Sequence, residues 1–499
     1  MFEKLAKNGA AAVTAALFVL LYGNILIYKG SVKYAVLAAA YAVGMIVFYL
    51  LLDRFSHQLT PMRTRVITLL IWAVIIFGGG FVVYGFREYM IIDMKEVYDS
   101  AWHLIRNSGQ LGERSWYFIR CKNNFGFLLL SYIVHHTGFR KFGIRQNTEA
   151  SVNFVTYVNF AFVLLAMWLT VQIIRKINNS PQVHILALVI VGSYLPFYIW
   201  SPLFYTDTTT MFFPPLMLYL YYALSKAKDN STRVLISIAA GLICMAGYAL
   251  KGSVPILLIA FLIMIFIKID KNSRKNIMAC CLAAVLAFGI SYKAYDRYYY
   301  NSGIIDFSTR QQNELPLELW FLFASHQPAE WYMEEYNYML SLPDIETRKA
   351  EAVRMIKENY SSYSPKERMD FIRDKNMLIW GEETFTGLDY LYNAYTGSWT
   401  HNFIIPGYPF YAPFRYLCNF VHLGTLLLFV VSVFTEFFKK KTDVYSMAKI
   451  TLVGVLIFLS FWERNARYVL TFTPLILVCC VETIVFISRK IFCKPVDKQ

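Results

Sequence analysis

Charged side chains interrupt the most apolar parts of the sequence at three places. Asp207 lies in FYTDTTTMFF, between two segments apolar enough to cross a bilayer, and Lys251 lies in GYALKGSVPILLI. Glu463, Arg464 and Arg467 follow another apolar segment, in FWERNARYVL. Because a charge at membrane depth is costly, such residues usually line a polar pathway or mark a helix end that faces water. A carboxylate there can accept a proton, and a cation can bind phosphate.

A further carboxylate, Asp93, lies in REYMIIDMKEVYDSAWHLIRN, directly after an apolar run. At helical spacing one face of this segment carries Asp93, Glu96, Ser100 and His103. The opposite face carries Met94, Val97, Tyr98, Ala101, Leu104 and Ile105. The pattern predicts an amphipathic helix at the membrane interface. Two interpretations stay open: a polar face that is only solvated, or a carboxylate held at the bilayer surface as a general base.

The other charged residues also have simpler interpretations. Asp207 could cap the N-terminus of the following helix, a role that does not exclude chemistry. Lys251 could extend its ammonium group to the interface instead of binding an anionic partner such as a lipid phosphate. Arg464 and Arg467 could form surface ion pairs instead of a guanidinium clamp for phosphate.

The composition is that of a membrane protein. Of 499 residues 57% are hydrophobic and only 16% are charged, and the mean hydropathy is +0.42. Apolar runs long enough to cross a hydrocarbon core of ~30 Å lie near 11–28, 34–52, 66–86, 151–174, 182–200, 208–225, 233–250, 276–294, 416–437, 445–461 and 468–488, with a shorter one at 254–268. We therefore expect an all-α polytopic membrane protein with about twelve transmembrane helices.

The positive charge predicts an orientation. The formal net charge of +15 is concentrated in alternate short loops, such as RKINNSPQ, SKAKDNSTR and KIDKNSRKN. Lys/Arg-rich short loops face the cytoplasm, so both termini are expected there. The first run lacks a small-residue cleavage site and is expected to remain as a helix. Two long polar segments, 87–150 and 295–415, are then extracytoplasmic.

These features divide the chain into four regions. Residues 1–65 form an accessory N-terminal hairpin, and 66–294 form a transmembrane core that includes the first outer segment. Residues 295–415, with charges and aromatic residues at helical spacing, are expected to form a helical cap. Residues 416–499 contain the last helices and a cytoplasmic tail.

Several kinds of site have no sequence support. The eight cysteines include no CxxC pair, which argues against a disulfide framework or a zinc site. No phosphate-binding glycine motif of either common type is present. We expect no metal, no cofactor and no nucleic-acid partner.

Several stretches together resemble the GT-C superfamily of polytopic glycosyltransferases, in particular the bacterial and protein-O-mannosyltransferase-like members that use polyprenyl-phosphate sugars. The similarity covers roughly residues 66–490. Its elements are D-x-x-x-x-Y-x-x-A beginning at Asp93, an interfacial KNNFG segment, the LFYTD turn, a lysine at a helix mouth, and E-R-x-x-R-Y-x-x-x-x-x-P ending at Pro474. The resemblance implies a GT-C fold with outer-face juxtamembrane helices and a large outer loop.

The resemblance also implies roles for individual residues. Asp93 matches the catalytic base and Asp207 the acidic residue of the second outer turn. Lys251 matches the donor-phosphate site, and Arg464 and Arg467 match the basic pair of the terminal motif.

The sequence departs from the family next to Asp93. Many relatives have a second acid immediately after the base, whereas this chain has Met94 and Lys95 followed by Glu96. Glu96 is therefore a further catalytic candidate, and the identity of the partner carboxylate stays open. His103 and Glu463 are included with the expected substrate-binding residues.

The expected activity is transfer of a sugar, with inversion, from a polyprenyl-phosphate donor to a glycan or glycopolymer of the bacterial cell envelope, at the outer face of the plasma membrane. The alternatives are a flippase or exporter of lipid-linked saccharides, or a polymerase. A transporter should carry charges near the membrane midplane, whereas the charged residues here are expected at one face. The sequence identifies neither the sugar nor the acceptor.

Overall fold

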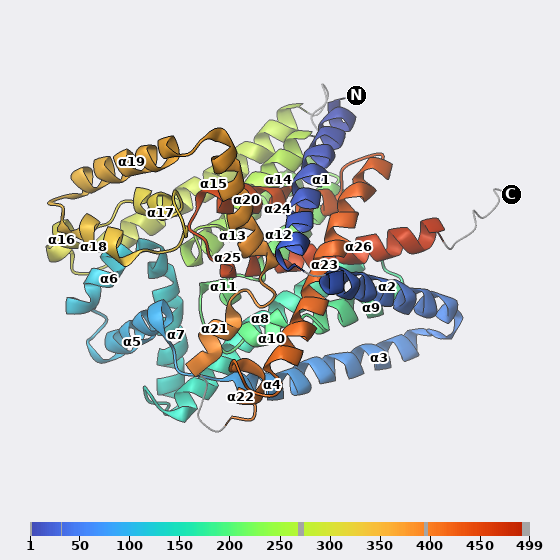
Figure 1. Ribbon diagram of the computed structural model, residues 1–499, viewed down its shortest axis with the longest axis horizontal. Helices are drawn as coiled ribbons and strands as arrows, with labels where there is room; N and C mark the ends of the chain where they lie inside the picture. The colour runs from blue at the N-terminus through green and yellow to red at the C-terminus, as the bar shows by residue number, and fades with distance from the viewer. Residues whose placement is uncertain (1, 31, 268–273, 394–397, 492–499) are drawn as a thin grey trace.

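The computed structural model describes residues 2–30, 32–267, 274–393 and 398–491, which fold into helices without a β-strand (Figure 1). Within these ranges, eight helical segments are long and apolar enough to cross a membrane: Leu5–Tyr28, Val32–Arg54, Pro61–Phe86, Glu149–Ile177, Asn230–Leu250, Arg274–Asn301, Tyr411–Phe438 and Val444–Phe461. Two shorter apolar helices are α9 (Pro181–Gly192) and α14 (Ile256–Ile267). This is the pattern of a polytopic membrane protein, and the number of twelve crossings stays a prediction.

Three of the apolar runs are divided by a break. The run at 182–200 forms two helices, α9 and α10 (Pro196–Trp200). The run at 208–225 forms α12 (Phe213–Lys226), and the short helix α11 (Thr206–Thr209) precedes it. The run at 468–488 forms α25 (Arg467–Leu470) and α26 (Thr473–Ile491). A proline lies in the first turn of α10 and α12, where its missing N–H costs no helical hydrogen bond. The breaks place polar main-chain groups and short helices close to the residues described below.

The N-terminal hairpin belongs to the main core. Helices α1 (Phe2–Tyr28) and α2 (Val32–Arg54) pack along α23 (Tyr411–Phe438). A Cβ at Gly424 would lie 2.4 Å from the Tyr41 ring, so glycine permits this close packing. The predicted accessory hairpin therefore shares one hydrophobic core with the C-terminal helices.

The first polar segment follows a span made of α3 (Pro61–Ala73), a π-helical turn (Val74–Gly78) and α4 (Gly79–Phe86). It contains α5 (Ile92–Arg106), α6 (Ser115–Arg120) and α7 (Phe125–Phe142), and α5 packs on α7. The expected apolar face of α5 is buried from Met94 to Leu104, but Ser100, which was expected on the polar face, is also buried. The reason is that Ser100 lies beside the packed residues Val97 and Ala101, so the solvated face is narrower than predicted.

The start of α7 lies against the end of α13 (Asn230–Leu250). A Cβ at Gly126 would lie only 1.9 Å from the carbonyl oxygen of Ala249. Because no larger side chain fits there, glycine allows the first polar segment to approach the end of a membrane helix. The start of α7 therefore contacts Ala249, which precedes Lys251 by two residues in the sequence.

The second polar segment begins later than expected, since α15 (Arg274–Asn301) continues seven residues beyond the predicted crossing. It then forms α16 (Arg310–Asn313), α17 (Glu318–Phe323), α18 (Met333–Ser341), α19 (Ile345–Ser362), α20 (Pro365–Gly381), α21 (Gly387–Tyr390) and α22 (His401–Ile404). A small separate core joins α17, α18 and α19. Arg348 is buried beneath it and donates hydrogen bonds to the carbonyl groups of Gln312, Glu314, Leu340 and Leu342.

The two polar segments lie side by side. The main-chain N–H of Leu111 donates to Ile304 (2.9 Å), and the N–H of Asp306 donates to the Ser115 hydroxyl (2.8 Å). Figure 1 shows α5 and α6 beside α16 to α19 at the left, with α2 and α3 at the right. Helix α20 extends from this group to pack against α1 and α24 (Val444–Phe461).

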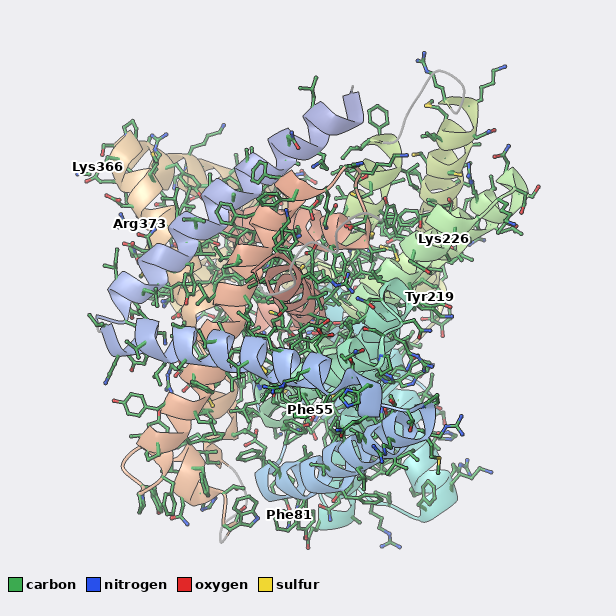
Figure 2. The ribbon with its side chains drawn as sticks, turned by 90° about the vertical axis from the view of Figure 1, so that its right-hand side faces the viewer. Phe55, Phe81, Tyr219, Lys226, Lys366 and Arg373 are labelled. Atoms are coloured by element: carbon green, nitrogen blue, oxygen red, sulfur yellow. The ribbon has the colours of Figure 1, made fainter. Side chains whose placement is uncertain are left out.

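Figure 2 gives the view at a right angle. Lys366 and Arg373 of α20 lie on one side of the molecule, and Lys226 at the end of α12 lies on the other. Helix α20 and the end of α12 therefore lie on opposite sides of the molecule in this view. The orientation of the chain in the membrane stays a prediction.

Candidate active site

Asp93 lies in the first turn of α5, and a chain of hydrogen bonds fixes one of its carboxylate oxygens. The Tyr117 hydroxyl donates to Asp93 Oδ1 (2.9 Å), and Asn124 Nδ2 donates to the Tyr117 oxygen (2.7 Å). The Tyr205 hydroxyl in turn donates to Asn124 Oδ1 (3.1 Å). The side chain of Asp93 keeps 36% of its surface exposed. The carboxylate is thus oriented by α6 and the KNNFG segment but is open to a ligand.

Asp207 forms an ion pair with Lys251. Asp207 Oδ1 contacts Lys251 Nζ, and the two side chains are 1% and 7% exposed. Asp207 Oδ2 has no hydrogen-bond partner among the residues that the structure describes. The predicted capping role is wrong, because the N-cap positions of α11 and α12 are occupied by Tyr205 and Phe212.

Helix α25 is held against α11. The Thr471 hydroxyl donates to the main-chain oxygen of Asp207 (3.1 Å) and the hydroxyls of Thr210 and Thr471 are 3.1 Å apart. These buried contacts hold the C-terminal end of α25 and so place this short helix, with Arg467 at its start, beside the Asp207–Lys251 pair. The interruption of two apolar runs thus positions the charges.

Arg467 is buried among aromatic rings and faces Asp93. Its guanidinium carbon lies 5.3 Å from the ring centre of Tyr205, 5.7 Å from that of Tyr390 and 5.6 Å from that of Tyr468. Its Nη2 lies 3.8 Å from Asp93 Oδ2. Arg467 Nε has no hydrogen-bond partner within the described part of the chain. Aromatic faces stabilise the cation while donors stay available.

Lys251 and Arg467 share one aromatic neighbour. Lys251 Nζ lies 5.5 Å from the ring centre of Tyr468, at nearly the distance of the Arg467 guanidinium. The Tyr468 hydroxyl donates to Glu463 Oε1. Two cations from distant parts of the sequence therefore border the same tyrosine.

Glu463 and Lys375 complete the buried charges. Burial raises the pKa of Glu463, while the Tyr468 hydrogen bond and the charge of Arg467 act in the opposite direction. Lys375, from α20, is 2% exposed and donates to the Ser460 carbonyl oxygen (3.0 Å). Burial lowers the pKa of Lys375 to about 7, and nearby Glu463 opposes the shift. The cap therefore contributes a side chain to this region.

Three of the expected site residues lie apart from the others. Arg464 pairs with the exposed Glu330 and does not share the buried position of Arg467. Glu96 lies 3.6 Å from Arg114, with both side chains 37% exposed. His103 contacts Asn107, the residue that follows the end of its own helix. We define the candidate site as the residues Asp93, Asp207, Lys251, Lys375, Glu463 and Arg467, with Tyr117, Tyr205 and Tyr468.

Sequence reasoning missed the polar residues that orient these charges. Asn124 lies in the KNNFG stretch, Tyr205 lies in the LFYTD stretch, and Tyr468 follows Arg467 in the terminal motif. An aromatic or amide residue in each of these stretches was the sequence signal that could have identified them. Lys375 gave no signal, because it is one of many charged residues in its helix.

The arrangement combines a partly open carboxylate with buried cations. Such cations can hold an anionic group and stabilise negative charge that develops on it. Across the described residues no group of three or more His, Cys, Asp or Glu side chains could hold a metal ion.

Comparison with known proteins gave one result. The comparison with curated proteins and the comparison with solved structures each gave no match. A family described as "conserved hypothetical integral membrane protein" matches residues 11–485. This description supports membrane integration and names no reaction. Since the match includes nearly all of the chain, the protein belongs to this family of integral membrane proteins.

Proposed function

We propose that the protein is an inverting glycosyltransferase that moves a sugar from a polyprenyl-phosphate donor to a cell-envelope glycan at the outer face of a bacterial plasma membrane. The observation that carries the proposal is the position of Asp93, oriented by Tyr117 and 3.8 Å from the buried Arg467. A base next to a phosphate-binding cation is what displacement of a lipid phosphate requires. The GT-C resemblance points to the same chemistry.

Arg467 and Lys251 are the proposed phosphate-binding residues. Arginine can present two parallel N–H groups to a phosphate, and Arg467 Nε has no partner within the described ranges. Lys251 lies on the same tyrosine ring and is paired with Asp207. An arriving phosphate would share Lys251 with Asp207, so Asp207 tunes how strongly the donor is held.

Asp93 is the proposed general base. The acceptor hydroxyl oxygen attacks the anomeric carbon as its proton passes to Asp93, and the bond between that carbon and the phosphate oxygen breaks. Polyprenyl phosphate leaves with the electron pair, and the configuration at the anomeric carbon inverts. Because Tyr117 engages Oδ1, the less constrained Oδ2 is the oxygen that accepts the proton.

A flippase or exporter of lipid-linked saccharides is the second candidate, and the broken helices favour it. Interrupted helices line the binding sites of many transporters, and α11 and α25 are short helices beside buried charges. The two functions differ in whether the donor is consumed. A transporter moves an intact lipid-linked sugar, whereas a transferase releases polyprenyl phosphate.

The test uses full-length protein, a radiolabelled polyprenyl-phosphate sugar and an envelope extract as acceptor. We expect Asp93→Asn to slow transfer by about 10²-fold or more, since an amide cannot accept the proton, while donor binding is retained. Asp370→Asn on the exposed face of α20 is the matched control and should leave transfer unchanged. Near-parental turnover by Asp93→Asn, or intact donor translocated by wild-type protein, would refute the proposal.

A further inference from the structure

The linker between α4 and α5 holds a buried carboxyl group that lacks a partner. Glu88 is 1% exposed, and neither of its carboxyl oxygens has a hydrogen-bond partner among the residues that the structure describes. A buried polar group without a partner costs free energy. Burial raises the pKa of Glu88 well above its usual value and so favours its neutral, protonated form.

Glu88 lies in the wall of a cavity of about 240 Å³. The other walls come from α5, through Lys95, Tyr98 and Asp99, and from the start of α8 (Glu149–Ile177), through Ser151. A water molecule occupies about 30 Å³ of liquid. The cavity therefore has room for a small organic group.

This cavity is separate from the candidate site. Successive residues on a helix are turned by about 100°, so Lys95 and Asp99 project from the side of α5 opposite to Asp93. Glu88, from the linker, joins that opposite side. A ligand of the cavity would not contact the proposed base.

The other charged groups around the cavity already have partners. Lys95 Nζ lies 2.8 Å from Asp99 Oδ2, and Arg87 Nη2 lies 3.0 Å from Glu149 Oε1. Each of these two ion pairs joins one positive and one negative side chain, whereas Glu88 has no cationic partner among the described residues. The missing partner is therefore a cation or a hydrogen-bond donor.

Neutral polar groups in the wall are also engaged. Tyr98 accepts a hydrogen bond from the Asn147 main-chain N–H (3.0 Å), and its hydroxyl lies 2.9 Å from the Ser151 hydroxyl. Lys95 is paired with Asp99, and the hydroxyls of Tyr98 and Ser151 are paired with each other. A ligand that brings its own N–H groups and a positive charge therefore complements Glu88 best.

We propose that this cavity binds a primary ammonium group, from a small amine or from a lipid head group, and that Glu88 is its counter-ion. On binding, Glu88 releases its proton to solvent and the carboxylate pairs with the ammonium. The candidate span Pro61–Phe86 ends two residues before Glu88, which places the cavity where the polar head groups of a bilayer lie. The proposal does not rest on glycosyl transfer.

The first test is calorimetric titration of ethanolamine into full-length protein in maltoside detergent, in buffers of different ionisation enthalpy. We expect saturable binding with release of about one proton. At pH values below the raised pKa of Glu88, the affinity should increase with pH, by up to tenfold per pH unit. Glu88→Gln should weaken binding at least tenfold and abolish proton release. Glu113→Gln, an exposed change in the same polar segment, should behave as wild type.

The second test identifies the source of the ammonium group. Phosphatidylethanolamine and phosphatidylglycerol are compared at equal mole fraction in mixed micelles. Binding of both ethanolamine and phosphatidylethanolamine supports the proposal as a general ammonium site. Binding of the lipid alone supports it as a lipid-specific site. Three outcomes would overturn the proposal. Neither ethanolamine nor phosphatidylethanolamine binds, folded Glu88→Gln binds ethanolamine with the affinity of the wild type, or Mg²⁺ displaces ethanolamine in a Glu88-dependent manner.

Discussion

Two clusters of buried charge lie near opposite ends of α24 and differ in how completely their groups are paired. The candidate site follows the C-terminal end of α24 at Glu463, whereas Lys449 lies near its N-terminal end. Lys449 lies 12 residues before the end of α24 at Phe461, which corresponds to about 18 Å of helix. We call the second group the ion cluster; it consists of Glu436, Lys439, Asp443, Lys449 and Glu482.

The ion cluster is satisfied internally. Lys449 Nζ lies 2.7 Å from Glu436 Oε1 and 2.6 Å from Glu482 Oε2. Lys439 Nζ contacts the same two glutamates at 2.7 and 2.5 Å. The hydroxyls of Thr435 and Ser446 donate to Glu482 and Glu436. Its charged groups therefore need nothing from outside the protein.

The candidate site has similar burial but incomplete pairing. Asp207 Oδ2 and Arg467 Nε have no partners among the described residues, and Arg467 approaches Asp93 only to 3.8 Å. Buried polar groups are normally hydrogen-bonded, so unpaired ones require an explanation. The comparison teaches that burial of charge alone does not mark a functional site; unused donors and acceptors beside a partly exposed carboxylate do.

The largest effect on stability is expected in the ion cluster. Lys449→Met would leave Glu436 and Glu482 with fewer partners in a buried place, and removal of one partner from a buried ion pair costs about 3–5 kcal/mol. The free energy of unfolding, measured by denaturant titration in detergent, should fall by that amount. A change below about 1 kcal/mol would show that the cluster is not a structural element.

A smaller effect is expected at Asp207. Asp207→Asn retains an oxygen that can accept from Lys251 but removes the opposing charge. We expect turnover to fall about tenfold, equivalent to about 1.4 kcal/mol, and donor affinity to rise because Lys251 becomes free to hold phosphate. Steady-state kinetics with separate donor binding checks this. A loss of donor affinity would contradict the assigned role.

The smallest effect concerns Lys375 and pH. Its pKa is about 7 in the folded protein against 10.5 for the free side chain, so between these values the unfolded chain binds the extra proton. Stability should therefore rise with pH in that window, by about 1 kcal/mol from pH 7 to 8. Lys375→Met should lack this rise. Parallel unfolding curves for both proteins would show that Lys375 remains charged when buried.

Much of the helical architecture was predictable, because hydrophobic runs of the right length need few other signals. The predicted runs at 34–52, 233–250 and 445–461 correspond to α2, α13 and α24. The breaks in the runs at 182–200 and 468–488 were not predicted. Each remains apolar on both sides of the break, so hydropathy alone does not reveal it.

The candidate site was predicted in part, since charges within apolar sequence attract attention. Asp93, Asp207 and Arg467 stood out for that reason. The separation of Arg464 from Arg467 was not predictable, because three residues of a loop can turn neighbouring side chains in different directions. Lys375 was missed because its burial depends on how α20 packs against α24.

The most direct test of the difference between the two clusters compares donor affinity and stability in Arg467→Met and Lys449→Met. Arg464→Met, whose guanidinium pairs with exposed Glu330, is the control and should change neither quantity much. Polyprenyl-phosphate-sugar binding and the unfolding midpoint are measured on the same detergent-purified samples. We expect Arg467→Met to lose at least tenfold in donor affinity while its midpoint stays near that of the control, and Lys449→Met to show the reverse. Unchanged donor affinity in Arg467→Met would contradict the assignment of this cluster as a phosphate-binding active site.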